Sequence, residues 1–446
     1  MKWRVGNDTL PEQHKRSREE VTVQLAGLIL ISAVCPVVSV WAGTLETLLL
    51  VHAASLLAAG KLLAETRPAF VSNRECVRNH RYRRFVEQFQ SQRVVGVVSL
   101  FCVATAFALL GGLAGSSSLE TITTTLRESY RPGHADLLVG DGSVLGIAAA
   151  VLLFVGTAAS FGLFPMHAVL MNGFVLSPAG IAGTTSILQR VQAAVVLWKV
   201  AVVAMPGFES TVLLLCVVFG AASCMGGSIL ACRSESLRGL AGSFWISWGG
   251  VSLVAAATGL TSVAPSDART AWQFPTGLET AVFSLLTSAV AVAMLLACDH
   301  WLTREDRSVD FAEDVTGLGQ QHGAMASAIG CSLLAMCAIP PLPGFWCVMF
   351  VTGNAFRPGV ESTQGPSLVP DASIMFATVL LLISLLLLSA RAVHVLSLVF
   401  LHEPIRRFEI PGRRVSAWGS LAAVGLLLWT GLNVGTLFAW IHRLPL

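Results

Sequence analysis

Charged residues are scarce in this sequence. Asp, Glu, Lys and Arg together make up 12% of its 446 residues, whereas soluble domains usually carry about 25%. Hydrophobic residues reach 54% and the mean hydropathy is +0.70, so most of the chain is expected to lie in lipid. The basic residues are spread along the chain and leave a formal net charge of only +3. The concentrated basic surface that a nucleic-acid partner would need is therefore absent from the sequence.

Paired cysteines and catalytic clusters are missing as well. The ten cysteines form no CxxC pair and no Cys/His spacing typical of a metal site. Cys102, Cys216 and Cys347 lie in apolar runs, where cysteine packs as a small hydrophobic side chain. No Ser/His/Asp set, phosphate-binding loop or carboxylate pair is visible. The sequence predicts no metal and no cofactor in this chain.

A cleavable leader is not apparent at the N-terminus. The first 20 residues are polar and include four acids, namely Asp8, Glu12, Glu19 and Glu20. A signal peptide needs a short apolar region and a small-residue cleavage site, and a transit peptide is poor in acids. We therefore expect a polar, solvated tail at 1–20 and a single transmembrane domain at 21–446.

Long apolar runs are what the sequence has in abundance. Runs of about 20 apolar residues are candidate membrane spans, and their number predicts an all-α polytopic membrane protein with about 11 transmembrane helices. The runs fall near 21–42, 44–64, 93–114, 143–163, 179–204, 210–231, 240–262, 277–299, 323–353, 371–402 and 415–441.

The distribution of Lys and Arg predicts the orientation. With the N-terminus inside, the inner connections hold 19 basic residues and the outer ones hold 5. Basic residues accumulate in the inner connections of membrane proteins. The sequence thus predicts an inner N-terminus and, after eleven spans, an outer C-terminus.

Two basic residues lie inside the run at 179–204. Charges within spans are costly and usually face a bundle interior or a water path. Arg190 lies eleven residues into its predicted helix, where a functional position is favoured over snorkelling. Lys199 follows nine residues later, half a turn round a regular helix, so the two side chains should meet different surroundings. Lys199 is open to two interpretations, a functional group or a side chain that snorkels to the interface.

Three further polar residues stand in apolar settings. They are His52 in LLLVHAASLL, His167 in GLFPMHAVL and Arg391 in LLLSARAVHVL. Each is either a titratable group of a transport path or a polar tie between neighbouring helices.

Prolines interrupt two regions of the apolar sequence. The segment CAIPPLPGFWCVMFV places Pro340, Pro341 and Pro343 within the run 323–353. Proline lacks a backbone donor and clashes with the preceding turn, so this helix is expected to break. Pro165 and Pro178 flank the connection before the run 179–204. Transporters use such broken helices to expose backbone dipoles to ions near mid-membrane.

Five segments, in this order and spacing, resemble a known family. AIPPLPGFW resembles its GIPPLxGF signature, and DFAEDVTGLG resembles the acidic loop upstream. FPMHAVLMNGFVLSP is similar to the family's VPFHxWxPDxYxGxP. LRGLAGSFWISWGG, which contains Arg238, is similar to its Arg-Leu-Leu-x-Tyr-Ser-Ser-Ile-Ser-His-x-Gly segment. SARAVHVLSLVFLHEP is similar to a Tyr-Leu-Arg segment, with Arg391 at the position of the arginine. The family is the N-type antiporter-like membrane subunit, chain 2, of respiratory complex I (NADH–ubiquinone oxidoreductase).

The resemblance covers roughly residues 45–405 and implies a fold, a function and a location. The fold is a helical bundle with two antiporter-like inverted repeats and broken helices near 179–204 and 323–353. The function is proton translocation coupled to NADH:ubiquinone oxidoreduction, without a redox centre or cofactor in this chain. The implied partners are other complex I membrane subunits, including sibling antiporter-like chains, and phospholipids such as cardiolipin. Eleven spans resemble the family's shortened form, which implies the mitochondrial inner membrane, with the N-terminus in the matrix and the C-terminus in the intermembrane space.

The titratable row of the family is altered in this sequence. Its glutamate falls on His52, and its lysines fall on Ser160, Arg190 and Val348. Histidine titrates near neutral pH, but a guanidinium does not deprotonate in proteins, serine can only order water and valine blocks polar contact. The candidate proton-path or mid-membrane positions are His52, Ser160, His167, Arg190, Lys199, Arg238 and Arg391.

These departures leave three interpretations open. The chain is a complex I subunit whose proton conduction is reduced or rerouted, an independent secondary cation/proton antiporter of the same fold, or a structural scaffold of the complex. An independent antiporter would need an ion site of its own, and the missing lysines argue against it.

Overall fold

The part of the chain that the computed structural model describes is helical, with a single isolated β-bridge between Thr44 and Ser118. The described residues are 12–65, 80–129, 141–176, 179–203, 205, 208–260, 276–302, 315–356, 371–404 and 413–444. Pro178 and the acidic part of DFAEDVTGLG lie outside them. The expected N-terminal tail lies partly outside them, and α1 already begins at Glu12.

The first half of the chain forms seven α-helices and a π-helical segment. Their bounds are α1 (Glu12–Trp41), α2 (Leu45–Glu65), α5 (His80–Ala114), α6 (Leu119–Ser129), α7 (Asp141–Phe161), α8 (His167–Leu176), α9 (Ala179–Trp198) and η2 (Lys199–Val203).

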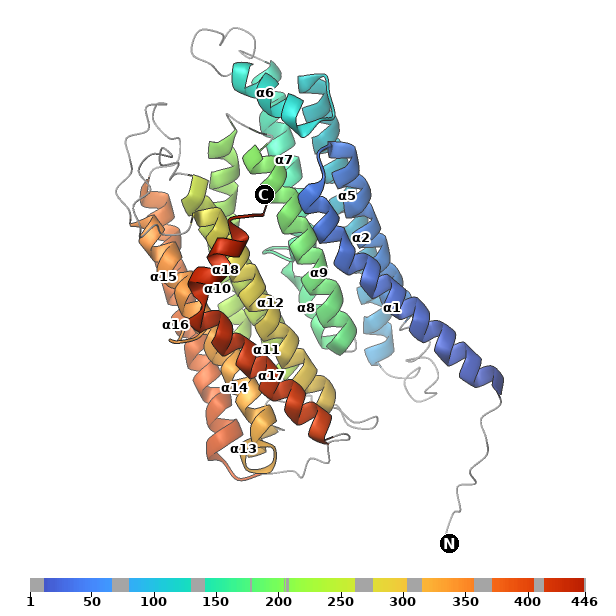
Figure 1. Ribbon diagram of the computed structural model, residues 1–446, viewed down its shortest axis with the longest axis vertical. Helices are drawn as coiled ribbons and strands as arrows, with labels where there is room; N and C mark the ends of the chain where they lie inside the picture. Colours follow the sequence, from blue (N-terminus) through green and yellow to red (C-terminus); the bar gives the residue numbers. More distant parts are fainter. Residues whose placement is uncertain are drawn as a thin grey trace.

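The second half continues the bundle beside the first, with most helices running along the same long axis (Figure 1). Its helices are α10 (Glu209–Arg233), α11 (Leu237–Leu260), α12 (Gly277–Leu302), α13 (Leu318–Gln321), α14 (Gly323–Met336), α15 (Pro343–Ala355), α16 (Asp371–Leu401), α17 (Arg413–Leu432) and α18 (Val434–Ile441).

Helix α11 forms the centre of the bundle. The most apolar 18-residue window within its membrane-length segment, Leu237–Thr258, is entirely buried. Small residues allow α10 to lie directly against it: a methyl group on Gly227 would lie 2.5 Å from the Ser247 nitrogen, and one on Gly250 would lie 2.4 Å from the Gly220 oxygen. Such glycine contacts bring helix backbones together where lipid offers no hydrophobic driving force. Helices α7, α8, α12, α15 and α16 pack against the close α10–α11 pair.

The helices have the length and composition of a polytopic membrane protein. Among the described residues, seven are long and apolar enough to cross a membrane, and an eighth span results if α17 and α18 are counted together. The apolar parts of α1 and α14, at Ala26–Trp41 and Gly323–Met336, are shorter. All eleven predicted segments contain helix, and the all-α fold class is confirmed, whereas the count of eleven spans stays a prediction.

The predicted break in 323–353 is confirmed. Helix α14 ends at Met336 and α15 begins at Pro343, a first helical position that suits proline. The Met336 carbonyl, left without a helical partner, accepts the Trp248 indole N–H at 2.9 Å. Gly344 is required here, because a methyl group would lie 1.8 Å from the Ala335 oxygen.

The other predicted break takes a different form, and a third interruption was not expected. In 179–204 the helix continues without a gap and changes to a π-helix at Lys199–Val203. The predicted single run at 415–441 is bent by 80° between α17 and α18. Apolar composition alone carried no sign of this bend, because Asn433 is the only polar residue at it.

Candidate functional site

Two of the predicted positions, His52 and Ser160, are joined through a third residue. His52 on α2 is buried, and its Nε2 lies 3.2 Å from Ser99 Oγ on α5. The same oxygen lies 2.8 Å from Ser160 Oγ on α7. A continuous polar chain thus crosses three helices. Ser99 was not identified from the sequence, since a lone serine in an apolar run carries no signal.

The protons of this chain can be assigned by counting donors. The Ser99 hydroxyl donates to the Gly156 carbonyl at 2.7 Å. A hydroxyl has one hydrogen to donate and two lone pairs to accept with, so Ser99 accepts from both His52 Nε2–H and Ser160 O–H. His52 Nδ1 then carries the lone pair, and this atom is buried without a hydrogen-bond partner. The chain converges on Ser99 and ends at a backbone carbonyl.

Gly156 allows α5 and α7 to approach each other at Ser99. A methyl group on Gly156 would lie 2.9 Å from the Ser99 carbonyl oxygen. Helices α5 and α7 can therefore approach closely enough for Ser99 to reach the Gly156 carbonyl.

A polar cavity adjoins Ser160. Its volume is about 40 Å³, and since one water needs about 10–15 Å³, it has room for about three. The polar residues lining it come from α5, α7 and α9 and are Gln92, Ser160, Thr185, Ser186 and Gln189. The Oε1 atom of Gln92 is buried without a hydrogen-bond partner. Ser160 therefore connects the His52–Ser99 pair to a space that can hold water.

Arg190 is completely buried beside this cavity but does not line it. Its Nε donates to the Phe161 carbonyl at 3.0 Å, and its Nη1 donates to the Trp245 carbonyl. The guanidinium carbon lies 3.9 Å from the centre of the Trp245 ring and 5.5 Å from that of Phe161. Nη2 has no hydrogen-bond partner. The side chain thus links α9 to the end of α7 and to the central helix α11.

Lys199 faces away from Arg190, as the helical spacing predicted. Its ammonium group donates to the carbonyls of Ser39 and Val40 in the last turn of α1. Gln192, two turns earlier on the same face, donates to Ser39 Oγ at 2.7 Å. The last carbonyls of a helix lack helical partners and carry partial negative charge. Lys199 therefore caps the C-terminus of α1. This role differs from both predicted ones, a functional group and a side chain that snorkels to the interface.

Arg391 plays the same part for another helix. Its Nη2 lies 2.5 Å from the carbonyl oxygen of Ser234, the residue that ends α10. Arg190 likewise donates to Phe161, the last residue of α7. Three predicted site residues, Arg190, Lys199 and Arg391, thus satisfy carbonyls at helix C-termini. In a bilayer such groups have no water to bond, so the basic residues stabilise the helix ends.

Arg238 forms an ion pair that the sequence did not reveal. Its Nε donates to Asp299 Oδ2 at 2.5 Å, and the Asp299 side chain is fully buried. The pair joins the start of α11 to the end of α12. Asp299 ends an apolar run, and a carboxylate at that position was the signal that could have identified it.

His167 lies apart from the polar chain. It is the first residue of α8, and its ring stacks on Phe164 with centroids 4.7 Å apart and an interplanar angle of 12°. Phe164 is tied to α10 by a backbone N–H that donates to Ser223 Oγ at 3.0 Å. His167 is thus part of the turn between α7 and α8.

The break between α14 and α15 carries no charged side chain. Val348 is half-buried against the hydrophobic core. The hydroxyl of Thr287 on α12 lies 4.0 Å from Cys347 Sγ, and Ser332 Oγ on α14 is buried without a hydrogen-bond partner. The second interrupted region therefore offers hydroxyls and a thiol near Val348, the position at which the resembled family has a lysine.

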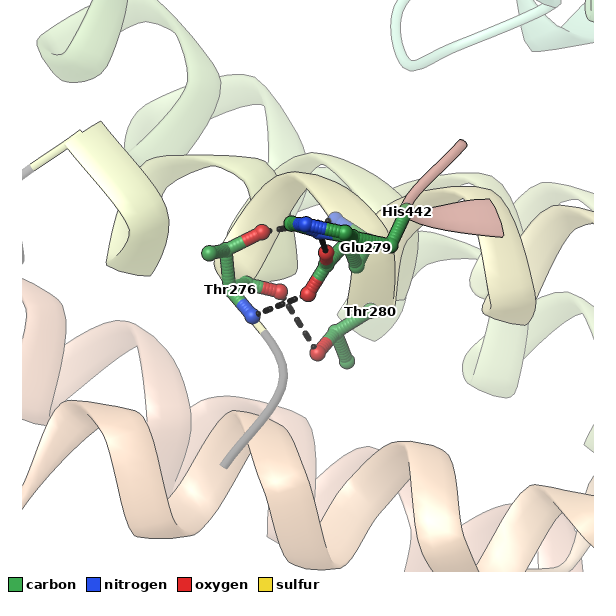
Figure 2. Close-up of polar contacts among 4 residues, drawn as sticks. All are labelled: Thr276, Glu279, Thr280 and His442. Atoms are coloured by element: carbon green, nitrogen blue, oxygen red, sulfur yellow. Dashed lines mark hydrogen bonds and ion pairs between the residues drawn. The ribbon is translucent and has the colours of Figure 1, made fainter. Parts of the chain in front are cut away.

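A hydrogen bond between a histidine and a carboxylate holds the bent C-terminal segment. His442, which ends α18, lies 2.7 Å from Glu279 Oε1 at the start of α12 (Figure 2). The other Glu279 oxygen accepts the Thr276 N–H at 2.7 Å, and Thr276 Oγ1 accepts the Glu279 N–H at 3.3 Å. This reciprocal pattern is a capping box. Glu279 thus fixes the start of α12 and the end of α18 together.

Within the described residues, no group of three or more His, Cys, Asp or Glu side chains could hold a metal ion. The arrangement offers hydroxyls, amides, one histidine and fixed cations. Its chemistry is the ordering of water and protons.

Comparisons with known proteins agree with the resemblance found in the motifs. No family model matches the chain. Two curated proteins named NADH-quinone oxidoreductase subunit N are similar to it. That of Methylobacterium nodulans is 26% identical over 271 residues, and that of Caulobacter sp. (strain K31) is 22% identical over 331 residues. These alignments cover 60% and 74% of this chain but only 50% and 62% of the relatives.

Solved structures share the fold. A chain of respiratory complex I from Thermus thermophilus matches 93% of this chain with a TM-score of 0.67 and 20% identity, and the match covers 79% of that chain. A chain of the Mrp complex from Dietzia sp. DQ12-45-1b matches 97% with a TM-score of 0.64 and 15% identity, and the match covers 93% of that chain. The chain therefore shares its fold with chains of these two complexes, and the curated relatives confirm the resemblance to the N-type subunit.

Proposed function

We propose that this chain is the N-type antiporter-like subunit in the membrane arm of an NADH–quinone oxidoreductase. It contributes to the integrity of that arm and to proton translocation coupled to NADH:quinone oxidoreduction, without a redox centre of its own. The observation that carries the proposal is the similarity to curated subunit N proteins over 60–74% of the chain. Its partners are the other membrane subunits, including sibling antiporter-like chains.

Proton conduction through this chain is reduced or rerouted. His52 is the one titratable group in its polar chain, and its Nε2 is bound to a serine whose own proton is held by the Gly156 carbonyl. Ser160 can order water beside the cavity but cannot carry a charge. Arg190 keeps its proton, and Val348 is apolar. These four positions support a subunit that retains the architecture while conducting little.

The finer location is also a proposal. We place the chain in the mitochondrial inner membrane, with its N-terminus in the matrix and its C-terminus in the intermembrane space. The unequal distribution of basic residues, 19 against 5, supports the orientation, and the prediction of eleven spans is the basis for the mitochondrial form. The curated relatives are bacterial, so fractionation of the source cells tests this point. Phospholipids, cardiolipin among them, would cover exposed apolar side chains such as Leu30, Leu386 and Leu401.

An independent cation/proton antiporter is the second candidate. The Mrp complex chain, matched over 93% of its length, favours it. Against it, the described charges are engaged: Lys199 and Arg391 cap helices, and Arg238 pairs with Asp299. No acidic residue faces the cavity, so an ion site of the chain's own is not apparent in the described part.

Mild detergent extraction distinguishes these candidates. The membranes are resolved on a native gel, stained for NADH oxidation and probed with an antibody to this chain. A complex I subunit migrates with the NADH-oxidising assembly. Migration of all detectable chain apart from that assembly would exclude the proposal and favour the antiporter.

A further inference from the structure

Arg190 is a permanent charge buried without a carboxylate. Within the described residues, the salt bridges join Arg238 to Asp299 and His442 to Glu279, and Arg190 bonds only to two backbone carbonyls and two aromatic faces. We propose that Arg190 is a fixed-charge proton barrier that closes the polar cavity beside Ser160 on the side of helix α11. The inference deepens the proposed function, because a barrier has a role only in a membrane that holds a proton gradient.

The position of Arg190 places its charge directly behind the cavity wall. Its neighbour Gln189 lines the cavity, as do Ser160 and Gly162 on either side of Phe161. The Phe161 carbonyl oxygen accepts a hydrogen bond from Arg190 Nε. On the far side, a methyl group on Gly249 would lie 3.0 Å from the guanidinium carbon, so the group fills the space between the cavity wall and α11.

The chemistry of the guanidinium group makes Arg190 a barrier to protons rather than a relay for them. A guanidinium keeps its proton in proteins, so it cannot accept one from water in the cavity. Its positive charge also repels a hydronium ion. In a water-poor interior this repulsion is stronger than it would be in bulk water, so it lowers the proton occupancy of the cavity. An arginine excludes protons and cations from narrow pores in the same way.

Helix capping is the competing explanation, because the Phe161 carbonyl ends α7. Capping accounts for Nε but leaves Nη2 buried without a partner. An ionised group buried in this way is costly, and a neutral donor could satisfy the same carbonyl. A barrier gives the charge itself a role.

The test uses the full-length chain in sealed vesicles of neutral phospholipid that contain a pH-sensitive dye. Proton leak after an external pH jump is compared for the unchanged chain, Arg190→Gln and Arg190→Lys. Arg127→Lys, on the exposed face of surface helix α6, is the matched control. Potassium leak is measured in parallel, and each variant must elute as a single folded species.

The barrier predicts a proton leak at least about tenfold higher for Arg190→Gln. Potassium leak should stay unchanged, because a cavity of about 40 Å³ is too small for a hydrated potassium ion. Arg190→Lys should become tighter than Arg190→Gln as the pH is lowered, because a buried lysine regains its charge at low pH. Equal rises in proton and potassium leak would overturn the proposal, since Arg190 would only hold helices together. An unchanged proton leak in folded Arg190→Gln would overturn it as well. Neither result depends on whether the chain migrates with an NADH-oxidising assembly, so the two proposals fail separately.

Discussion

The indole N–H of Trp346 donates to the carbonyl of Gly431 at 2.8 Å, and this bond joins two interrupted helices. Trp346 lies in the first turn of α15, just after the proline break, and Gly431 lies in the last turn of α17, just before the 80° bend. The same interface contains Phe350 and Phe438, whose rings meet edge to face at 5.2 Å. Trp346 thus satisfies a backbone carbonyl next to the α17–α18 bend, where lipid could not.

Gly431→Ala should destabilise this junction. A methyl group at Gly431 would lie 2.1 Å from the Pro341 oxygen, so one of the two backbones must move. Such overpacking costs about 1–3 kcal/mol, and thermal unfolding in detergent should show a lower midpoint. Gly425→Ala on the same helix is the control, because nothing lies within 4 Å of its added methyl group. Equal midpoints for the two variants would contradict the close contact.

Ser99→Ala should release His52 from its fixed tautomer. In the unchanged chain Ser99 accepts from His52 Nε2–H, so ¹⁵N resonances of labelled histidine should show a single Nε2–H species. Without the serine oxygen, both tautomers should be populated. A His52→Gln variant assigns the resonance, and Ser284→Ala, whose hydroxyl bonds only within α12, is the control. An unchanged tautomer in Ser99→Ala would mean that another group orients the ring.

The sequence predicted the helical class, the proline break and the opposite facing of Arg190 and Lys199, because hydropathy, proline chemistry and helical period act locally. It did not predict the partners of the polar residues. Ser99, Asp299 and Glu279 contact side chains that are 47 to 163 residues away in the chain. The bend at Asn433 depends on α15 and α12, which hold α18 from outside.

The basic residues illustrate the same limit. A charge within an apolar run is costly and therefore indicates a structural or functional role. The apolar run does not reveal which group the charged side chain contacts. In the folded chain Lys199 and Arg391 lie at the ends of α1 and α10, helices that are distant in sequence from either residue. The free carbonyls of a helix end become hydrogen-bond partners for these basic side chains only once the bundle is assembled.

Lys199→Met should loosen the end of α1 without altering proton movement. A cation at a helix C-terminus contributes about 1 kcal/mol, and methionine keeps the length of the side chain. Hydrogen exchange should become faster for amides in the last turn of α1, near Ser39 and Val40. Lys61→Met, on the exposed face of α2, should leave this exchange unchanged. A change in proton translocation in the assembled complex would instead assign Lys199 to the path.

Asp299→Asn should be more damaging than loss of the whole ion pair. Breaking a buried pair leaves the remaining charge uncompensated and costs about 3–5 kcal/mol, whereas replacing both partners by apolar residues is often neutral. The double variant Arg238→Met with Asp299→Leu should therefore recover most of the stability lost in Asp299→Asn. Unfolding free energies of Arg238→Met, Asp299→Leu and the double variant give the coupling. Additive losses would show that the two side chains do not depend on each other.

His52→Gln in the assembled complex tests the conduction hypothesis directly. The polar chain from His52 ends at the Gly156 carbonyl, and a carbonyl cannot pass a proton onward because it only accepts hydrogen bonds. The number of protons translocated per electron pair should therefore match that of the unchanged complex, measured with NADH and quinone in sealed vesicles. His394→Gln, exposed on α16, controls for general effects of losing a histidine. A fall in protons per electron pair while electron transfer continues would mean that His52 carries protons, and that Ser99 must turn away from Gly156 during turnover.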